Sequence, residues 1–292
     1  MTMRAATEPD LEEMAALLAA DESRLLGRPS HTSVTDLRQW LALCDLPTGT
    51  WLLEDGEGIA ALGWSIMWGE AASAIGVVHP RAKGRGLGAR ILDCSEEWAA
   101  ARAPRIQQIG MGADEAAARL FTARGYREVR RFYGMAIELT APPEVPDPPI
   151  ETFAQADGGA FHAALDEAFR DHWEHHPRSF EEWWELHSSA PDFDPSLWFL
   201  IRDGSEIAAV VRNEPNRNGG GYVGAIGVRR PWRGRGHAKA LLLRTFREFW
   251  DRGVTRVTLG VDADSPTGAT HLYERVGMHV EDEQIVFERA LP

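Results

Sequence analysis

The hydrophobic positions of this chain follow two periods that alternate along it. Short runs of β-branched and aromatic residues, at 51–53, 59–67 and 74–78, predict neighbouring strands. After residue 87, and again in 237–250, apolar residues recur at helical spacing and predict amphipathic helices. Helices mixed with a largely antiparallel sheet predict an α/β fold.

The same order of elements occurs twice. The segment AIGVVHPRAKGRGLGARIL begins at Ala74, and AIGVRRPWRGRGHAKALL begins at Ala225. Farther on, LFTARGY at 120–126 is matched by LYERVGM at 272–278. Each copy continues after its helix with a strand (105–111; 256–261), a short helix and a last strand (126–139; 278–291). A repeat this long predicts an internal duplication.

A proline-rich stretch separates the two copies. Residues 140–151 read TAPPEVPDPPIE, with five prolines and no regular period. This composition predicts a linker at 141–150 that joins an N-terminal domain at 1–140 to a C-terminal domain at 151–292. Two domains also suit the length of 292 residues.

The charge balance narrows the possible partners. The chain has 31 Lys+Arg and 44 Asp+Glu, a formal net charge of -13, which argues against a nucleic-acid partner. It contains no apolar stretch long enough for a membrane span and no signal peptide, so we expect a cytoplasmic protein with no membrane partner. Two cysteines are too few for a disulfide framework.

A glycine-rich loop precedes a helix in each copy, at 83–88 and 233–238. The first turn of such a helix leaves backbone N–H groups unpaired, with the positive end of the helix dipole behind them. Glycine lets the backbone approach an anion without interference from a Cβ atom. Both loops therefore predict phosphate-binding sites.

Three known loops share this chemistry. Neither copy contains GxxxxGK[ST], which argues against nucleoside triphosphate hydrolysis. The dinucleotide pattern GxGxxG/A is nearly met by GRGLGA in the first copy but fails at Lys239 in the second. The pattern [RQ]xxGx[GA] is met by RGRGHA at 233–238, and KGRGLG at 83–88 departs from it only at Lys83.

The second copy closely resembles the acetyl-CoA site of the GNAT acyltransferase superfamily, in VRRPWRGRGHAKALL followed by LGVDADSPTGATHLYERVGM. The duplication is similar to that of tandem members such as mycothiol synthase. The resemblance covers nearly the whole chain. It implies two tandem GNAT domains, each with a mixed α/β sheet, in a monomer or homodimer. It also implies transfer of an acetyl group from acetyl-CoA (coenzyme A) to a primary amine of a small-molecule acceptor by direct attack.

The resemblance implies that the loop backbone holds the pyrophosphate, with the arginines as a cationic rim. The strand before the loop parts from its neighbour in this family and offers an N–H group to the thioester oxygen; Gly224 and Gly227 are compatible with that. The expected cofactor contacts in the second copy are Ile226, Gly227, Val228, Arg233, Gly234, Arg235, Gly236, His237 and Ala238. Those in the first copy are Lys83, Gly84, Arg85, Gly86, Leu87 and Gly88.

The resemblance implies that Tyr273, in LYERVG, donates a proton to the departing thiolate. A phenol has a pKa near 10 and can protonate a thiolate as it leaves. The base for the attacking amine is less clear. In mycothiol synthase a glutamate at the start of the equivalent strand acts as base, and Tyr222 stands there in this chain. Asp262 and Glu214 are further candidates, acting through water.

The first copy departs from the family pattern. Phe121 replaces the tyrosine, Lys83 replaces the arginine, and GADEAAA stands where the second copy has DADSPTG. Because phenylalanine has no proton to give, we expect a degenerate first domain that braces the second and keeps a loop for CoA. Catalysis is expected in the second domain.

The acceptor side of the second copy has unusual composition. Residues 141–228 hold 16 Asp+Glu and 5 Arg (5 − 16 = -11), whereas 229–292 hold 9 Asp+Glu and 11 Lys+Arg (11 − 9 = +2). An acidic groove would concentrate a cationic amine, although ordinary solubilising carboxylates explain the same count equally well.

The stretch AFRDHWEHHPRSFEEWWELH begins at Ala168, and a capping box at Ser179 and Glu182 predicts that a helix starts there. In the family the corresponding helices form the wall of the acceptor pocket. The residues expected to contact the acceptor are Asp171, His172, Trp173 and Glu174, with aromatic packing as the alternative for the tryptophan. No metal site is expected, because the histidines lack an HExxH pattern or a cysteine partner.

Three functions remain to be compared. The leading one is a CoA-dependent N-acetyltransferase, and the alternative is a non-catalytic acyl-CoA-binding sensor or regulator. A transferase that uses a charged RNA donor is disfavoured by the acidic balance.

Overall fold

The computed structural model describes residues 1–146, 149–190, 192–265 and 267–291. The chain forms two compact units, of which unit 1 comprises Met1–Tyr133 with Asp282–Pro292 and unit 2 comprises Gly134–Glu281. Residues 147 and 148 of the predicted linker lie outside the described part, as does Pro266 of DADSPTG. The described residues of the linker, 141–146 and 149–150, form neither helix nor strand.

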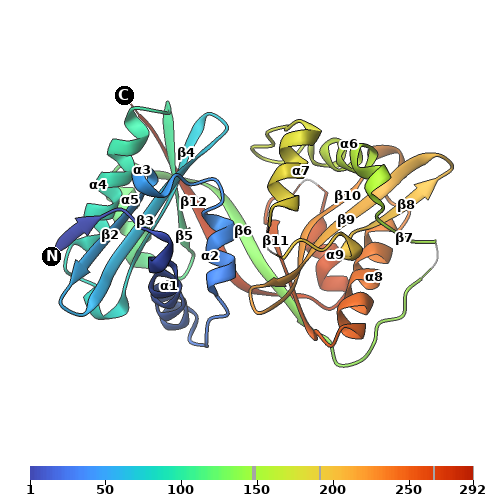
Figure 1. The fold of residues 1–292 in the computed structure, drawn as a ribbon, viewed down its shortest axis with the longest axis horizontal. Coiled ribbons are helices and arrows are strands. Elements are labelled where there is room, and N and C mark those ends of the chain that lie inside the picture. The colour runs from blue at the N-terminus through green and yellow to red at the C-terminus, as the bar shows by residue number, and fades with distance from the viewer. Residues whose placement is uncertain (147–148, 191, 266, 292) are drawn as a thin grey trace. The chain divides into compact units, whose positions relative to one another are not determined.

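Unit 1 is a sheet with strand order β1-β2-β3-β4-β5-β12, antiparallel except for the parallel pair β4–β5 (Figure 1). Its strands are β1 (Thr2–Arg4), β2 (Thr50–Asp55), β3 (Gly58–Trp68), β4 (Ala71–Val78), β5 (Arg105–Met111) and most of β12 (His279–Ala290). Its helices are η1 (Glu8–Asp10), α1 (Leu11–Leu26), α2 (Val34–Trp40), α3 (Leu46–Gly49), η2 (Pro80–Ala82), α4 (Leu87–Ala100) and α5 (Glu115–Ala123).

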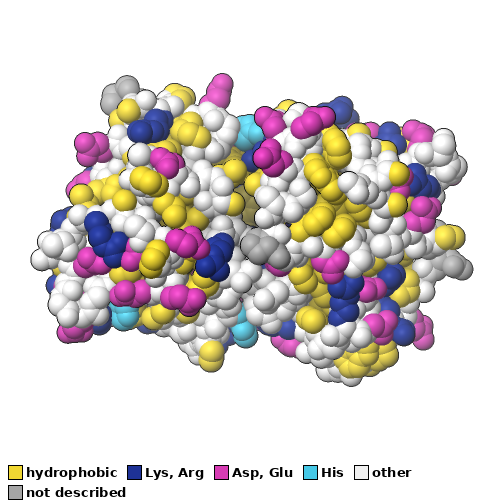
Figure 2. Space-filling view, viewed as in Figure 1, with side chains coloured by type: hydrophobic (Ala, Val, Ile, Leu, Met, Phe, Trp, Pro, Cys, Tyr) yellow, Lys and Arg dark blue, Asp and Glu magenta, His cyan; other side chains and the backbone are white. Residues whose placement is uncertain are grey.

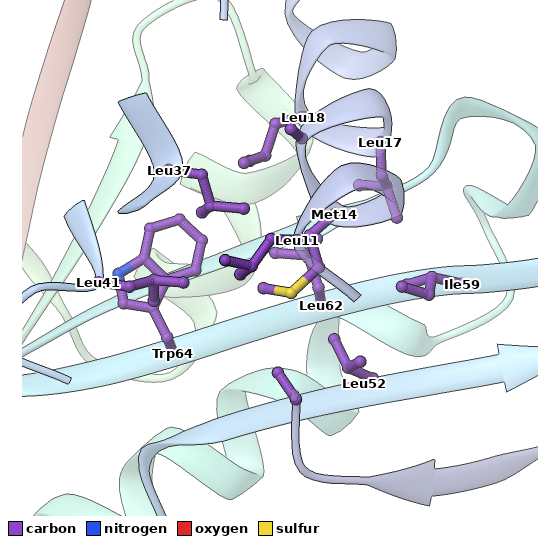
Figure 3. Close-up of a cluster of buried hydrophobic side chains, with 12 residues drawn as sticks. Leu11, Met14, Leu17, Leu18, Leu37, Leu41, Leu52, Ile59, Leu62 and Trp64 are labelled. Carbon is purple, nitrogen blue, oxygen red and sulfur yellow. The ribbon is translucent and has the colours of Figure 1, made fainter. Parts of the chain in front are cut away.

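Alternate strand residues of unit 1 face two helical layers. Leu62 packs in a cluster with residues of α1 and α2, and Leu53 packs in a separate cluster with Leu87 and Ile91 of α4. Figure 3 shows the first cluster, in which the side chains of α1 lie over Leu62 and its neighbours. Burying each such leucine stabilises the fold by about 1.5–3 kcal/mol. The packing of helices on both faces of the sheet gives β4 and the loop after it a rigid support.

Unit 2 repeats this plan. Its strands are the end of β6 (Arg127–Glu138), β7 (Glu151–Thr152), β8 (Phe199–Asp203), β9 (Glu206–Arg217), β10 (Gly220–Val228) and β11 (Arg256–Asp262), in the order β6-β11-β10-β9-β8-β7. Its helices are η3 (Gln155–Asp157), α6 (Gly158–Phe169), α7 (Phe180–Ser188), η4 (Pro195–Leu197), η5 (Arg230–Trp232), α8 (His237–Asp251) and α9 (Ala269–Arg275). A Cβ atom at Gly227 would lie 2.7 Å from Ala168 of α6, and one at Gly221 would lie 2.6 Å from Phe249 of α8.

The predicted α/β class and the predicted order of elements are confirmed. The predicted strands before the first glycine loop are β2, β3 and β4, and the helices after the two loops are α4 and α8. The capping box is present: Ser179 Oγ accepts from the Glu182 N–H at 3.2 Å, and Glu182 Oε2 accepts from the Ser179 N–H at 3.0 Å.

The last strand does not follow the domain boundaries expected from the repeat. β12 pairs antiparallel with β5, from Gln284 opposite Met111 to Ala290 opposite Arg105, so residues from Asp282 onward complete unit 1. Figure 1 shows this strand, in red, within the blue and green unit. Gly134–Glu138 of β6 belongs instead to unit 2. Either strand could satisfy an open sheet edge, because both have a similar alternation of side chains, so periodicity did not identify the exchange.

Candidate active site

Strands β10 and β11 of unit 2 are paired over only a short distance. Their parallel register joins Gly221 to Val257 and Tyr222 to Thr258, although β10 continues to Val228. In unit 1 the β4–β5 pairing likewise ends at Ala74, before the end of β4 at Val78. The parting of strands implied by the family resemblance is therefore present in both units.

A β-bulge distinguishes β10 from β4. The β9–β10 register shifts between Val223 and Ala225, which leaves Gly224 as the extra residue. The β3–β4 ladder runs without a shift over the described residues 61–68 and 71–78. A Cβ atom at Gly224 would lie 2.6 Å from Arg212 Nη2, so a larger residue at the bulge would displace the end of the Arg212 side chain. Because a bulge re-aims the backbone, unit 2 presents different N–H groups at its strand opening than unit 1 does.

The glycine loops have the same backbone conformation in both units. Gly234 and Gly236 have φ angles of 78° and 85°, and Gly84 and Gly86 both have 77°. A Cβ atom at any of the four would meet no described heavy atom within 4 Å, and no described side chain caps the first turn of α4 or α8. The N–H groups that open each helix therefore face open space, which suits a pyrophosphate.

Three arginines around the second loop are paired with carboxylates rather than forming an uncompensated cationic rim. The ion pairs are Arg229–Glu167 at 2.7 Å, Arg230–Asp171 at 2.5 Å and Arg235–Asp203 at 3.6 Å. The hydrogen bond from Arg230 lowers the pKa of Asp171, so this carboxylate stays charged at neutral pH. Asp171, which was expected to contact the acceptor, thus lies beside the loop.

Arg233 supports the loop from within the fold. Its Nε donates to the Val228 carbonyl at 3.1 Å, and its Nη2 donates to the Ala168 carbonyl at 3.3 Å. These bonds join the end of β10 and the end of α6 to the start of the loop.

We expect Arg233→Ala to raise the KM for acetyl-CoA about tenfold and to change kcat less, because the loop would lose two hydrogen bonds of about 1 kcal/mol each. Arg233→Lys should recover little, since an ammonium group cannot reach both carbonyls as the guanidinium fork does. Initial rates at varied acetyl-CoA measure both effects. A wild-type KM in both variants would contradict this role for Arg233.

Tyr273 on α9 is almost fully buried, with 6% of its surface exposed. Burial, with a smaller effect of nearby Tyr222, raises the pKa of its phenol above the usual range. The phenol therefore stays protonated at neutral pH and can donate a hydrogen bond to a developing thiolate. Phe121 on α5, its counterpart in unit 1, is also buried and packs against Phe287 with ring centroids 5.3 Å apart.

Glu214 is held between two arginines. It accepts from Arg212 at 2.7 Å and from Arg217 at 3.2 Å. Burial raises the pKa of Glu214, but the two guanidinium groups outweigh it and the net pKa is lowered. A carboxylate stabilised in this way is a weak base.

The other two candidate bases also have local partners. Tyr222 stands opposite Glu214 in the β9–β10 register, and the Arg217 guanidinium lies 4.3 Å from the centroid of its ring. Asp262 is buried, and its Oδ1 accepts from the Asp264 N–H at 3.0 Å.

A cavity of about 140 Å³ lies on the α6 and α7 face of unit 2. Its lining includes His162, Asp166, Phe169, His175, Trp183 and Ala225. Ala225 lies three residues after Tyr222, the last residue of β10 that is paired with β11, so the cavity adjoins the parted strands. Figure 2 shows hydrophobic side chains at the surface between α6 and α7.

The stretch predicted to contact the acceptor lies beside this cavity. His172 stacks on Phe169 with ring centroids 4.3 Å apart, and burial lowers its pKa. Trp173 is half-buried, and Glu174 has a φ angle of 51°. The lining comes instead from residues on either side, among them Asp166 and His175. From the sequence, the histidines of this stretch were considered only as metal ligands, and no metal site was expected. A single aspartate on an amphipathic helix, such as Asp166, does not indicate a functional role by its sequence position.

His187 at the end of α7 is half-buried among aromatic rings. Its Nδ1 lies 2.7 Å from the Trp183 carbonyl oxygen, and its ring centroid lies 5.0 Å from that of Trp183. Burial, reinforced by the Arg212 charge, lowers the pKa of His187 to about 4. The imidazole is therefore neutral at pH 7 and donates from Nδ1 to the carbonyl.

We expect His187 to make unit 2 less stable in mild acid. The folded pKa is lowered to about 4, below the ordinary value near 6.5, so the unfolded chain binds more protons as pH falls through this window. The free energy of unfolding should drop by about 2 kcal/mol between pH 7 and pH 5 from this group. In His187→Gln that component should vanish, as measured by urea unfolding at both pH values. An unchanged pH dependence would show that the imidazole is solvated.

Unit 1 contains a larger cavity, of about 250 Å³, between its parted strands, its glycine loop and α5. Phe121, Gln108 and Gly86 are among its lining residues. Lys83 also lines it, and its Nζ lies 3.0 Å from Asp21 and 3.2 Å from Asp114. These two carboxylates offset the cation that the loop pattern offers to a phosphate.

The acidic and basic halves of the second copy compensate each other. Several carboxylates in residues 141–228 form ion pairs with arginines in residues 229–292. These pairs are Arg229 with Glu167 and Glu206, Arg230 with Asp171, Arg235 with Asp203, and Arg252 with Asp194. Part of the excess negative charge that suggested an acidic groove is therefore neutralised by ion pairs within the fold.

No group of three or more metal-ligating side chains is found in the described part of the chain. Across the same residues, every helix is too short or too polar to span a bilayer.

Known proteins share both the sequence and the fold. The Acetyltransferase (GNAT) family matches residues 11–126 and again 159–278. A mycothiol acetyltransferase of Thermobifida fusca is 28% identical over 263 residues, covering 81% of this chain and 80% of the relative. One of Streptomyces avermitilis is 30% identical, covering 75% of this chain and 71% of the relative.

Two solved structures extend the comparison to the fold. A GCN5-related N-acetyltransferase from Sphaerobacter thermophilus has a TM-score of 0.86 at 34% identity, covering 99% of this chain and 95% of its own. A tandem GNAT protein from the clavulanic acid biosynthesis pathway has a TM-score of 0.75 at 14% identity, covering 99% of this chain and 98% of its own, and shares the fold. With the family matched in both halves, and with two units that each carry parted strands and a glycine loop, this chain belongs to the Acetyltransferase (GNAT) family as an N-acetyltransferase with tandem GNAT architecture.

Proposed function

We propose that the protein transfers an acetyl group from acetyl-CoA to the primary amine of a small molecule, and that unit 2 performs the chemistry. The observation that carries this assignment is the position of Tyr273. It is buried, and Tyr222, the last residue of β10 that is paired with β11, is close enough to help raise the pKa of its phenol; a glycine loop opens the helix that follows β10. The equivalent tyrosine is missing from unit 1, where Phe121 lines the cavity.

The residues present fit a CoA thioester. The backbone of the loop from Arg233 to Ala238 would bind the pyrophosphate, since its glycines leave the approach open. The pantetheine arm would enter between the parted strands. An N–H group of the strand Ala225–Val228 would then stabilise the negative oxygen of the tetrahedral intermediate, and the bulge at Gly224 supports this role because it re-aims that backbone.

The proton balance of the transfer can be stated for this chain. The amine nitrogen forms a bond to the acetyl carbon, the carbon–sulfur bond breaks, and Tyr273 gives the sulfur a proton. The proton that nitrogen loses as the amide forms replaces the one given by Tyr273. Raising the pKa of the phenol by burial keeps it protonated until the thiolate appears.

For unit 1 we propose a bracing role with a retained site for CoA. The cavity of about 250 Å³ and the open loop support binding, whereas Phe121 argues against transfer. The same cavity favours the second candidate function, an acyl-CoA-binding sensor. In that case both units would bind the donor and neither would transfer its acetyl group.

The acceptor is proposed as a small amine with an apolar or aromatic body. Phe169 and Trp183 in the cavity of unit 2 support this choice. The relatives are named for mycothiol, but the glutamate that mycothiol synthase uses as a base is Tyr222 here, so the acceptor is proposed as a class only.

A thiol-release assay tests the proposal. Acetyl-CoA is incubated with glucosamine, spermidine, phenethylamine and alanine amide, and thiol formation is compared with hydrolysis in buffer. We expect at least one amine to raise the rate, with an acetylated product in the mass spectrum. If acetyl-CoA binds by calorimetry but none of the amines raises thiol release, the sensor function replaces the enzyme.

A further inference from the structure

The cavity of unit 2 contains a histidine and an aspartate in hydrogen-bond contact. His175 Nε2 lies 3.0 Å from Asp166 Oδ1. Both residues line the cavity that also includes Ala225 of the parted strand. Because a carboxylate accepts, Nε2 carries the proton and Nδ1 keeps its lone pair.

We propose that His175 is the general base that deprotonates the acceptor amine, and that Asp166 is a positioning residue that holds the imidazole in the required tautomer. This inference rests on the proposed function, because it assigns a step of amine acetylation. It also explains how the chain dispenses with a base on β10, where Tyr222 stands.

The other titratable groups near the strand opening have different environments. Glu214 is held by two arginines, and Asp262 accepts a backbone N–H group. His187 donates to the Trp183 carbonyl within the last turn of α7. His175 combines a place in the cavity lining with a carboxylate on its far nitrogen.

His162 also lines the cavity but has a packing role. Its ring centroid lies 5.1 Å from that of Trp183 and 6.0 Å from that of Phe180. Burial lowers the pKa of His162.

The proton path is balanced. An acceptor amine reaches the cavity as an ammonium ion, and His175 Nδ1 takes one proton from it. The neutral amine then attacks the thioester as described above. His175 returns its proton to solvent before the next turnover, since 19% of its side chain is exposed.

The charges around His175 come from three segments. Asp166 and His162 face the cavity from α6, and His176 and Arg178 face it from the loop that carries His175. His175 in turn lowers the pKa of nearby His172, and α7 contributes the neutral Trp183. Asp166 is thus the one anion among the described lining residues, and it contacts the His175 ring at Nε2.

The test uses the fastest amine of the thiol-release panel and compares His175→Gln with wild type. We expect kcat to fall at least 100-fold, with the affinity for acetyl-CoA unchanged by calorimetry. The acidic limb of the kcat profile between pH 5 and pH 8 should disappear. His279→Gln is the matched control, because His279 also lies near a carboxylate, 3.7 Å from Glu281, but outside the cavity lining; it should keep the wild-type profile.

Asp166→Asn separates positioning from structure. Removing the anion should move the acidic limb to lower pH and reduce kcat about tenfold. In NMR spectra of the free protein at fixed pH, the ring nitrogen shifts of His175 should change, because the tautomer that Asp166 holds is lost. If His175→Gln retains the wild-type rate and acidic limb, His175 is not the base. An acidic limb and ring nitrogen shifts left in place by Asp166→Asn would overturn the role of Asp166. Absence of turnover in wild type would instead refute the proposed function.

Discussion

Replacing Tyr273 with phenylalanine is expected to lower kcat about 100-fold and to leave the dissociation constant of acetyl-CoA unchanged. The thiolate leaves without a hydrogen bond or a proton in this variant, and general acid catalysis is commonly worth 10²–10⁴-fold. The pocket should remain intact, because phenylalanine keeps the ring and Tyr273 is buried mainly through that ring. Steady-state kinetics with calorimetry of acetyl-CoA binding provide both numbers.

Tyr126→Phe is the matched control for this experiment. Tyr126 is a buried tyrosine of unit 1 whose hydroxyl donates to Glu96 at 3.1 Å, so its replacement removes a phenol of similar burial outside the proposed site. We expect wild-type kcat for this control. If Tyr273→Phe also keeps wild-type kcat, the thiolate is protonated by another group and the assignment of unit 2 as catalytic loses its main support.

Introducing a carboxylate at Gly236 is expected to weaken acetyl-CoA binding by unit 2 more than 100-fold. Aspartate tolerates a left-handed backbone better than most residues, so Gly236→Asp should fold at φ near 85°. Its charge would stand where the pyrophosphate is expected, at the open start of α8. A 100-fold loss corresponds to about 2.7 kcal/mol. The KM for acetyl-CoA in the transfer assay measures it for the reacting unit.

The two ends of α8 offer a control for backbone strain. Gly253 follows the helix with a φ angle of 78°, and a Cβ atom there also meets no described heavy atom within 4 Å. Gly253→Asp should therefore strain the backbone in the same way as Gly236→Asp, destabilise the fold further because its charge lies at the negative end of the α8 dipole, and leave the KM unchanged. Gly236→Asn, which adds the same bulk without charge, should lie between them. Equal KM values for Gly236→Asp and Gly253→Asp would show that the anion binds elsewhere.

Much of the fold could be predicted because its signals are local. Positive φ angles at Gly84, Gly86, Gly234 and Gly236 favour glycine, so the loops are visible in the sequence and occur twice. The capping box at Ser179 and the helices after the loops depend on neighbouring residues in the same way. The expectation that strands part at β10 came from the family resemblance and is met by the register.

Side-chain pairing could not be predicted. The sequence suggested that the arginines after Val228 form a cationic rim, whereas Arg230 binds Asp171 and Arg229 binds Glu167, both more than 50 residues away. Ion pairs at this separation depend on how α6 crosses the sheet. The pairing of His175 with Asp166 is hidden for a related reason, since it needs the loop after α6 to turn back on the helix.

By itself the sequence determined the duplicated α/β plan, the two glycine loops and the contrast between Tyr273 and Phe121, because helix period, backbone conformation and residue identity are properties of short segments. Only the tertiary structure decided that β12 completes unit 1, that Gly224 bulges against Arg212, and that His175 meets Asp166 in a cavity. These features depend on which strand fills an open edge and which side chains meet across a sheet. Such contacts are selected by the packing of the whole unit, and no single segment encodes them.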